Sequence, residues 1–345
     1  MSNVNPLGRF VWHELMTPDP DAAIEFYPAV TGWGVLPYDL DPSYRMWTVN
    51  GVPLGGVLPI PEEAKAMGAV PYWLPYVGTS DLAATLDHAV RLGATMYVPP
   101  TTIPVGTFSV LRDPQGATFA LFQAAEFVPG HEGEAEDGEF SWHELRTTDG
   151  AAAWKFYKEL FDWNATGAMD MGPDGVYQMF GRNGVEMGGM YKSDAVPPSW
   201  LSYVRVPGTD AAIKHAKRLG GDVASGPMAV PGGNYIAEMR DAHGVAFALH
   251  EEREKTAPGV KPKAKPKAKM KAKAKKAVKA VKAKTKPKAK AKSKAKLKVK
   301  AKAKTRAKSK PKSKPKTKSK AKPKTKPKTK PKSKLKTKAS RRRRR

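Results

Sequence analysis

The chain has 345 residues, no cysteine and a formal net charge of +29. The lack of cysteine excludes disulfides, thiolate metal sites and cysteine nucleophiles. We find neither a basic-then-apolar leader nor a run of about 18 apolar residues, so we expect a cytoplasmic protein without a membrane span.

The charge is distributed unevenly along the chain. Residues 261–345 hold 44 of the 61 Lys and Arg residues, and neither Asp nor Glu. The first 260 residues therefore hold 17 basic groups against all 32 acidic ones. An acidic part followed by a strongly basic part indicates contact with nucleic acid or with an anionic membrane surface.

The first predicted elements are a strand and a helix. Residues 10–16 (FVWHELM) are typical of a strand. Asp19 is a good N-cap and Pro20 suits the first helical position; the apolar residues that follow share one helical face until Gly32, where we expect the helix to end.

The rest of the first 126 residues is predicted to add strands around a second helix. The alternating runs and turn residues indicate strands around 44–49, 53–58 and 72–77, a helix at about 80–92, and strands near 95–98, 107–112 and 117–123. The element order βαβββ therefore occurs twice in this part of the chain. It predicts an α+β fold of curved mixed sheets with the helices outside.

This part of the chain is repeated. The repeated segments are WHEL at 12–15 and 142–145, FY at 26–27 and 156–157, NG at 50–51 and 183–184, GG at 55–56 and 188–189, WLPYV at 73–77 and WLSYV at 200–204, and DPQGATFALF at 113–122 and DAHGVAFALH at 241–250. The spacing drifts from 130 to 133 and then to 127–128, which indicates small loop insertions. We therefore predict tandem domains at 8–126 and 139–253, a linker at 127–138 and a basic tail at 254–345.

The two copies resemble the vicinal oxygen chelate superfamily, which includes glyoxalase I, bleomycin-resistance proteins and extradiol dioxygenases. The resemblance rests on the segment 19–33 (DPDAAIEFYPAVTGW), on DPQGATFAL at 113–121 and on their repetition, and it covers residues 8–252. It implies the fold. Because one fold supports many activities, the function has to be argued from the site.

The resemblance also implies where metal ligands would stand. The first-strand ligand falls on Trp12 and Trp142, the second on Tyr72 or Trp73 and on Ser199 or Trp200, the terminal glutamate on Ala120 and Ala248, and the remaining carboxylate near 46–49 or 179–182, where there is none. Trp and Ala cannot bind a divalent ion. We therefore predict no metal site and no cofactor.

This conclusion depends on the register of the first strand. If Trp12 faces the cleft, so does Glu14, whereas His13 points to the helix side, because strand side chains alternate. A slip of one residue would turn His13 and its counterpart His143 into the clefts. The Asp and Phe-Tyr landmarks favour the Trp register, in which both histidines are structural.

Glu14 and Glu144 are the candidate catalytic residues. Each is expected on the cleft face among aromatic residues, where partial burial would raise its pKa and suit it as a general base or as an anchor for a cationic ligand. The alternative is a carboxylate satisfied by backbone amides or by a neighbouring Arg.

Five further residues are candidates for ligand binding. They are aromatic groups expected to line the two clefts, together with one histidine on the last strand: Trp12, Trp73, Trp142, Trp200 and His250. Indole faces suit planar or cationic ligands. The alternative is that the tryptophans are core residues and the histidine belongs to the core or the rim.

Residues 261–345 alternate Lys with Ala, Pro, Ser or Thr and end in RRRRR. Such a segment cannot bury enough apolar surface to offset its ordering entropy, so we expect disorder. In composition it resembles the C-terminal tails of linker histones. We expect sequence-independent binding to nucleic acid by counterion release, with a solubility element or an anionic lipid ligand as alternatives.

Three functions follow from these features, and they leave open whether the protein is an enzyme. The favoured one is metal-free binding of an unknown small molecule in aromatic clefts, with the tail fixing the protein on nucleic acid, in association with the nucleoid. A second is a metal-dependent lyase or dioxygenase of the glyoxalase type, which would use off-register ligands such as His13, Glu14, His143, Glu144 and His250. The third is a nucleoid-compacting protein with a passive body.

Overall fold

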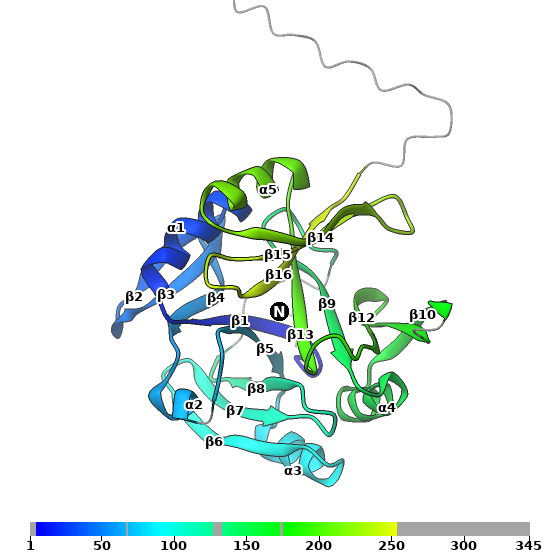
Figure 1. Ribbon diagram of the computed structural model, residues 1–345. Coiled ribbons are helices and arrows are strands. Elements are labelled where there is room, and N and C mark those ends of the chain that lie inside the picture. Colours follow the sequence, from blue (N-terminus) through cyan, green and yellow to red (C-terminus); the bar gives the residue numbers. More distant parts are fainter. Residues whose placement is uncertain (1–4, 67, 127–132, 173–174, 254–345) are drawn as a thin grey trace, which may run out of the picture. The chain divides into compact units, whose positions relative to one another are not determined.

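The computed structural model describes residues 5–66, 68–126, 133–172 and 175–253 (Figure 1). The predicted basic tail, 254–345, and half of the predicted linker lie outside the described residues, and the expectation of disorder stays a prediction. Within the described ranges, no helix is long and apolar enough to cross a membrane.

The first repeat forms one eight-stranded mixed sheet. Its elements are β1 (Phe10–Thr17), α1 (Pro20–Thr31), β2 (Gly34–Tyr38), β3 (Asp41–Val49), β4 (Val52–Pro59), α2 (Glu62–Ala66), β5 (Tyr72–Gly78), α3 (Leu82–Arg91), β6 (Thr95–Ile103), β7 (Gly106–Arg112) and β8 (Thr118–Ala124). The strand order is β2-β3-β4-β1-β5-β8-β7-β6. β1 pairs with β4 and β5 with β8 in parallel, and the antiparallel pair β1–β5 joins the two βαβββ modules.

The second repeat forms a second sheet with the same topology, β10-β11-β12-β9-β13-β16-β15-β14. Its elements are β9 (Phe140–Thr147), α4 (Gly150–Phe161), β10 (Asn164–Asp170), β11 (Val176–Arg182), β12 (Val185–Lys192), β13 (Ser199–Arg205), α5 (Thr209–Arg218), β14 (Asp222–Ala229), β15 (Tyr235–Arg240) and β16 (Ala246–Glu251). The predicted α+β class and the repeated βαβββ modules are confirmed.

The ends of α1 show how local sequence sets an element. The Asp19 carboxylate accepts a hydrogen bond from the Ala22 N–H, Pro20 opens the helix, and Gly32 ends it in the left-handed conformation with φ of 82°. Gly32 donates its N–H to the Pro28 carbonyl. These are the N-cap and C-terminal glycine signals expected for a helix of this length.

The drift in repeat spacing corresponds to an insertion. β4 and β5 are separated by residues 60–71, whereas residues 193–198 alone separate β12 and β13. The longer connection contains α2, which the sequence analysis did not predict. Ala64 of α2 packs against the first sheet, as do Ile60 before the helix and Ala69 after it. This connection therefore partly covers the first sheet, whereas the shorter connection of the second repeat, 193–198, forms no helix.

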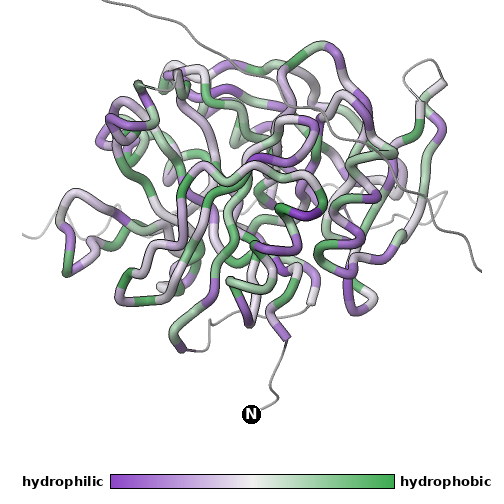
Figure 2. Tube along the Cα trace, turned by 90° about the horizontal axis from the view of Figure 1, so that it is seen from below, coloured by the Kyte–Doolittle hydropathy of each residue, from purple (hydrophilic) through white to green (hydrophobic). Residues whose placement is uncertain are grey.

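The helix sides of the two sheets share their hydrophobic cores. One cluster joins α1 and Trp47 of the first repeat to α5 and Phe247 of the second, and α1 lies beside α5 (Figure 1). A second cluster joins α3 and Phe119 to α4 and Trp163. Hydrophobic and hydrophilic residues are interleaved along the trace (Figure 2), as expected for elements buried on one side. Each repeat thus completes the core of the other.

Two polar chains cross between the repeats inside these cores. The Tyr157 hydroxyl of α4 donates to Asp113 Oδ2 at 3.0 Å and accepts from Trp200 Nε1 at 3.3 Å. Asp113 also accepts the N–H groups of the three-residue turn 115–117. The same arrangement links Tyr27, Asp241 and Trp73 in the other core. The repeated Phe-Tyr and Asp-turn motifs therefore hold the two repeats together.

We expect Tyr157→Phe to lower the free energy of unfolding by about 1–3 kcal/mol, because it leaves the buried Asp113 oxygen and Trp200 N–H without this partner. Chemical denaturation measures the change. The matched control is Tyr97→Phe, since the Tyr97 hydroxyl receives its hydrogen bond from Arg112 at an exposed site. That variant should stay within about 0.5 kcal/mol of wild type. Equal effects of the two substitutions would contradict the assigned role of the Tyr157 hydroxyl.

Candidate functional site

We call the face of each sheet that is turned away from the shared helix-side cores its inner face. In β1 the side chains alternate, so Trp12 and Met16 lie on the inner face with Tyr76 of β5, whereas Leu15 lies in the helix-side core. The first inner face is apolar and aromatic. Its members are Val11, Trp12, Met16, Ile60, Tyr72, Leu74, Tyr76, Val98, Phe108, Val110, Ala120 and Phe122, and several of the aromatic rings are half-buried.

Glu14 is the carboxylate of this face. It is 7% exposed, and its Oε2 accepts the Tyr76 hydroxyl at 2.6 Å. The Tyr44 hydroxyl also donates to Glu14, and Trp12 Nε1 donates to that hydroxyl at 3.1 Å. Burial raises the pKa of Glu14, and the two tyrosine hydrogen bonds oppose this rise in part. Among the described residues, no Lys, Arg or His forms an ion pair with this carboxylate.

The second inner face repeats this arrangement with one difference. Glu144 Oε2 accepts the hydroxyls of Tyr177 and Tyr203, each at 3.2 Å, and Trp142 Nε1 donates to Tyr177 at 2.8 Å. Here, however, Arg146 Nε donates to Glu144 Oε1 at 3.0 Å. Burial again raises the pKa of Glu144, and the guanidinium of Arg146 opposes this rise.

Arg146 bridges two carboxylates. Its Nη2 forms ion pairs with Glu144 Oε1 at 3.0 Å and with Glu238 Oε1 at 2.7 Å. In the first repeat, Met16 stands at the position of Arg146 and Val110 at the position of Glu238, as the strand registers show. The two carboxylate sites therefore share their tyrosines and tryptophan but differ in the nearby cation.

The repeated Gly-Gly pairs make room for the tyrosines. A Cβ at Gly56 would overlap the Tyr44 hydroxyl, and a Cβ at Gly189 would overlap the Tyr177 ring. A side chain at either position would push its tyrosine away from the carboxylate. The glycines are thus required by the close approach of an aromatic ring rather than by backbone conformation.

The two repeated histidines meet on the helix side of the sheets. Nε2 of His13 lies 2.8 Å from Nε2 of His143, and both rings are buried. Phe10 stacks on His143 and Phe140 stacks on His13, each with centroids 3.6 Å apart. His143 Nδ1 donates to the Met187 carbonyl at 3.1 Å, so Nε2 of the neutral ring is the acceptor and His13 Nε2–H is the donor. Burial lowers the pKa of both rings, and that of His143 falls to about 3.

The structure corrects the placement of two predicted ligand-binding residues. Trp73 and Trp200 lie in the helix-side cores, where they donate to Tyr27 and Tyr157. They do not line the inner faces, because the residue before Trp73, Tyr72, takes the inward position in the strand alternation. Trp12 and Trp142 do lie on the inner faces with Glu14 and Glu144.

His250 lies near the end of β16, beside the start of β9. Its Nδ1 lies 2.9 Å from the Ser141 hydroxyl, and the ring is half-buried. Burial lowers its pKa, with a further contribution from Arg205. Ala248, two residues earlier on β16, belongs to the second inner face, and strand alternation places His250 on the same side of the strand.

Sequence reasoning missed Tyr44, Tyr76 and Arg146, although Arg146 stands two residues after Glu144 and so shares its face.

In the first repeat, the places that the family resemblance assigns to metal ligands hold other residues. Trp12, Ala120 and Tyr72 occupy the three places that the family resemblance assigns to ligands, and Glu14 is surrounded by phenol groups. Across the described ranges, no group of three or more His, Asp or Glu side chains is placed to hold a metal ion. A divalent metal is held by N, O or S donors in a defined geometry, and the indole of Trp12 and the methyl group of Ala120 are not such donors.

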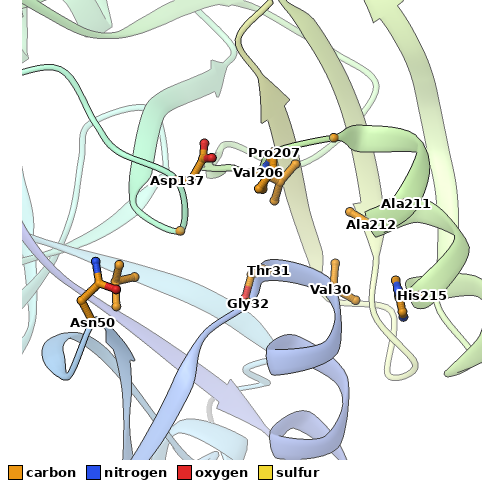
Figure 3. A pocket seen from close by; sticks show the side chains of 13 residues that line it. Val30, Thr31, Gly32, Asn50, Asp137, Val206, Pro207, Ala211, Ala212 and His215 are labelled. Atoms are coloured by element: carbon orange, nitrogen blue, oxygen red, sulfur yellow. The ribbon is translucent and has the colours of Figure 1, made fainter. Parts of the chain in front are cut away.

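Two pockets lie away from the inner faces. One, of about 460 Å³, adjoins the histidine pair and includes Phe10 and Phe140 in its lining. The other, of about 360 Å³, lies where the end of α1 meets α5 (Figure 3). Its polar lining includes Asn50, Asp137 and His215. Neither Glu14 nor Glu144 lines either pocket.

Solved structures with this fold are extradiol dioxygenases and glyoxalases. The 2,3-dioxygenase LapB from Pseudomonas sp. KL28 covers 74% of this chain and 97% of its own, with 13% identity and a TM-score of 0.54. The Mn(II)-bound glyoxalase from Novosphingobium aromaticivorans covers 72% of this chain and 83% of its own, with 15% identity and a TM-score of 0.52. At these identities the likeness shows the fold alone.

Residues 12–122 match the model of the glyoxalase-like domain family. A protein of Mycobacterium tuberculosis that carries the name glyoxylase CFP32 is 30% identical over 247 residues, which is 69% of this chain and 92% of that protein. The anthracycline biosynthesis protein DnrV of Streptomyces peucetius is 33% identical over 133 residues, 37% of this chain and 46% of that protein. The chain belongs to the glyoxalase-like proteins of the vicinal oxygen chelate superfamily.

Proposed function

We propose that the body binds a small organic molecule on the inner face of the first sheet without a divalent metal, and that residues 261–345 hold the protein on nucleic acid without sequence preference. One observation supports the binding site most directly. Glu14 is a buried carboxylate held by tyrosine hydroxyls within an aromatic face whose rings remain partly exposed. An apolar surface with a few placed polar groups is typical of small-molecule sites.

Glu14 also supplies a possible chemistry. A carboxylate whose pKa is raised by burial is suited to accept a proton from a bound molecule. Glu144, with Arg146 bound to it, is less available for that role because the guanidinium stabilises its charged form. Between the two candidate catalytic residues, the geometry favours Glu14.

A metal-dependent lyase or dioxygenase is the second candidate, favoured by the Mn(II)-bound glyoxalase among the structures with this fold. It would need His13 or His143 beside Glu14. In this fold the two histidines bind each other at 2.8 Å on the opposite side of the sheets, so these donors do not converge.

The experiment uses the full chain and 2-naphthalenemethanol, a neutral planar probe followed by quenching of tryptophan fluorescence. We expect saturable binding that is unchanged after EDTA treatment, and no stoichiometric metal in elemental analysis of the purified protein. Trp12→Phe should weaken binding or reduce the quenching. The control, Trp154→Phe, changes a tryptophan on α4 and should retain binding.

Two outcomes would overturn the proposal. The first is a stoichiometric transition metal whose removal abolishes binding, which would support the metal-dependent alternative. The second is that neither 2-naphthalenemethanol nor its charged analogue, 2-naphthylmethylammonium, binds saturably. Residues near Trp12 should also show the probe-dependent shifts in NMR spectra, and shifts confined to the pocket beside α5 would contradict the assigned location.

A further inference from the structure

The two inner faces carry the same carboxylate but balance its charge differently. In the second repeat, the guanidinium of Arg146 lies beside Glu144 among Trp142, Tyr177 and Tyr203. This is a cation bound to a carboxylate within an aromatic surround, supplied by the chain itself. The ion pairs are 3.0 Å or shorter and Arg146 is mostly buried.

In the first repeat the aromatic surround is kept, but no described residue supplies the cation. Glu14 has Trp12, Tyr44 and Tyr76 in the places of Trp142, Tyr177 and Tyr203. Met16 replaces the arginine and Val110 replaces the second carboxylate, Glu238. Both replacements are apolar and buried, so the Met16 side chain takes the place of the Arg146 guanidinium, and the described residues leave Glu14 without an internal cation.

From this difference, and resting on the proposed function, we propose that the first inner face binds an organic cation, an ammonium or amidinium group on an apolar or aromatic body. The cationic group would lie against Glu14 as the Arg146 guanidinium lies against Glu144. The body of the ligand would pack on the half-buried rings of Tyr72, Phe108 and Phe122. Charge-assisted hydrogen bonds and cation–π contacts both favour such a ligand over a neutral one of the same shape.

The size of the effect follows from the same interactions. A hydrogen bond to a buried carboxylate gains about tenfold or more in affinity when its donor is charged. Burial raises the pKa of Glu14, whereas a bound cation favours the charged form of this carboxyl group. Binding of the cation and loss of a proton from Glu14 should therefore be coupled.

The experiment compares 2-naphthylmethylammonium with 2-naphthalenemethanol on the full chain by calorimetry. We expect the ammonium to bind at least about tenfold more tightly. Glu14→Gln should remove that preference, because it should weaken binding of the ammonium at least about tenfold more than binding of the alcohol. The matched control, Glu25→Gln, removes the same charge from an exposed position on α1 and should keep the preference.

A second variant transfers the internal cation. The double substitution Met16→Arg and Val110→Glu copies the pair Arg146–Glu238 into the first repeat, and we expect it to block the ammonium site. Circular dichroism and thermal unfolding identify any variant that fails to fold, and Glu14→Gln then decides alone. Equal affinity for ammonium and alcohol, or a preference that survives Glu14→Gln, would overturn the inference while leaving the proposed function intact. Binding of neither probe would overturn the proposed function itself.

Discussion

A chain that ends at residue 260 is expected to lose nearly all of its affinity for nucleic acid. The removed segment carries 44 basic and no acidic residues, and the remaining part carries 17 basic against 32 acidic groups. We therefore expect phosphates to repel the truncated protein, and we expect the full chain to bind them by counterion release. At low salt we expect a loss of affinity of at least about a thousandfold.

The salt dependence makes this prediction specific. If about 10 phosphates are engaged, the logarithm of the binding constant should fall with the logarithm of the salt concentration with a slope near −9. Fluorescence anisotropy with a labelled duplex at several salt concentrations measures the slope. Duplexes of different sequence should give the same line, because the segment has no aromatic residue for base stacking and contacts to phosphates alone carry no sequence information.

The control keeps the charge and changes the chemistry of the groups. Replacing the last five arginines, 341–345, by lysines should leave the slope nearly unchanged. Replacing ten lysines of the same segment by glutamine should reduce its magnitude. A truncated chain that binds DNA and RNA as tightly as the full chain would show that the acidic part holds the interface. Binding to anionic vesicles but not to nucleic acid would identify a lipid partner instead.

Most of the fold could be predicted from the sequence, because the signals that begin and end its elements are local and occur twice. The Asp19–Pro20 start and the Gly32 end of α1 are set by capping within a few residues. The repeat spacing indicated an insertion near α2, but its short length gave no helical periodicity to recognise. The exchange of core residues between repeats was not predictable, because no local pattern records which sheet a given apolar face will meet.

The sequence predicted those parts of the site that follow from the alternation of side chains along a single strand. Alternation placed Trp12 and Glu14 together. Trp73 was misplaced because the count from the family landmarks left Tyr72 and Trp73 both open, and Tyr72 is the one that faces inward. The tyrosines that hold the carboxylate come from other strands, whose register depends on bulges and turns. The contact between His13 and His143 arises from the approximate symmetry between the repeats, which brings equivalent residues together.

We expect the buried histidine pair to make a destabilising contribution to the body that grows as the pH falls below about 6.5. The pKa of His143 is lowered by burial from 6.5 to about 3, and burial also lowers the pKa of His13. Between these values the unfolded chain binds a proton that the folded chain does not. Stability is therefore full above the unfolded pKa, and each such proton removes about 1.4 kcal/mol of unfolding free energy per pH unit as the pH falls.

Other buried groups act in the opposite direction. The raised pKa values of Glu14, Glu144 and Asp113 mean that the folded chain takes up protons more readily there, so their contribution to stability increases on acidification. The pocket beside the histidines also has charged residues in its lining: Arg9, Glu136, Glu139, Arg182 and Glu186. The net curve therefore mixes several signs, and a difference between variants is needed to isolate the histidines.

The variant His143→Gln provides that difference. It removes one buried imidazole, and its amide can still donate to the Met187 carbonyl or accept from His13. Between pH 6.5 and 4.5, the wild-type unfolding free energy should fall faster than that of the variant by about 1.4 kcal/mol per pH unit. Urea denaturation at each pH measures it. The control variant His243→Gln removes an exposed imidazole, and its unfolding free energy should change with pH as that of the wild type does. Parallel curves for wild type and His143→Gln would contradict the prediction, because they would show that protonation of the histidine pair does not destabilise the fold.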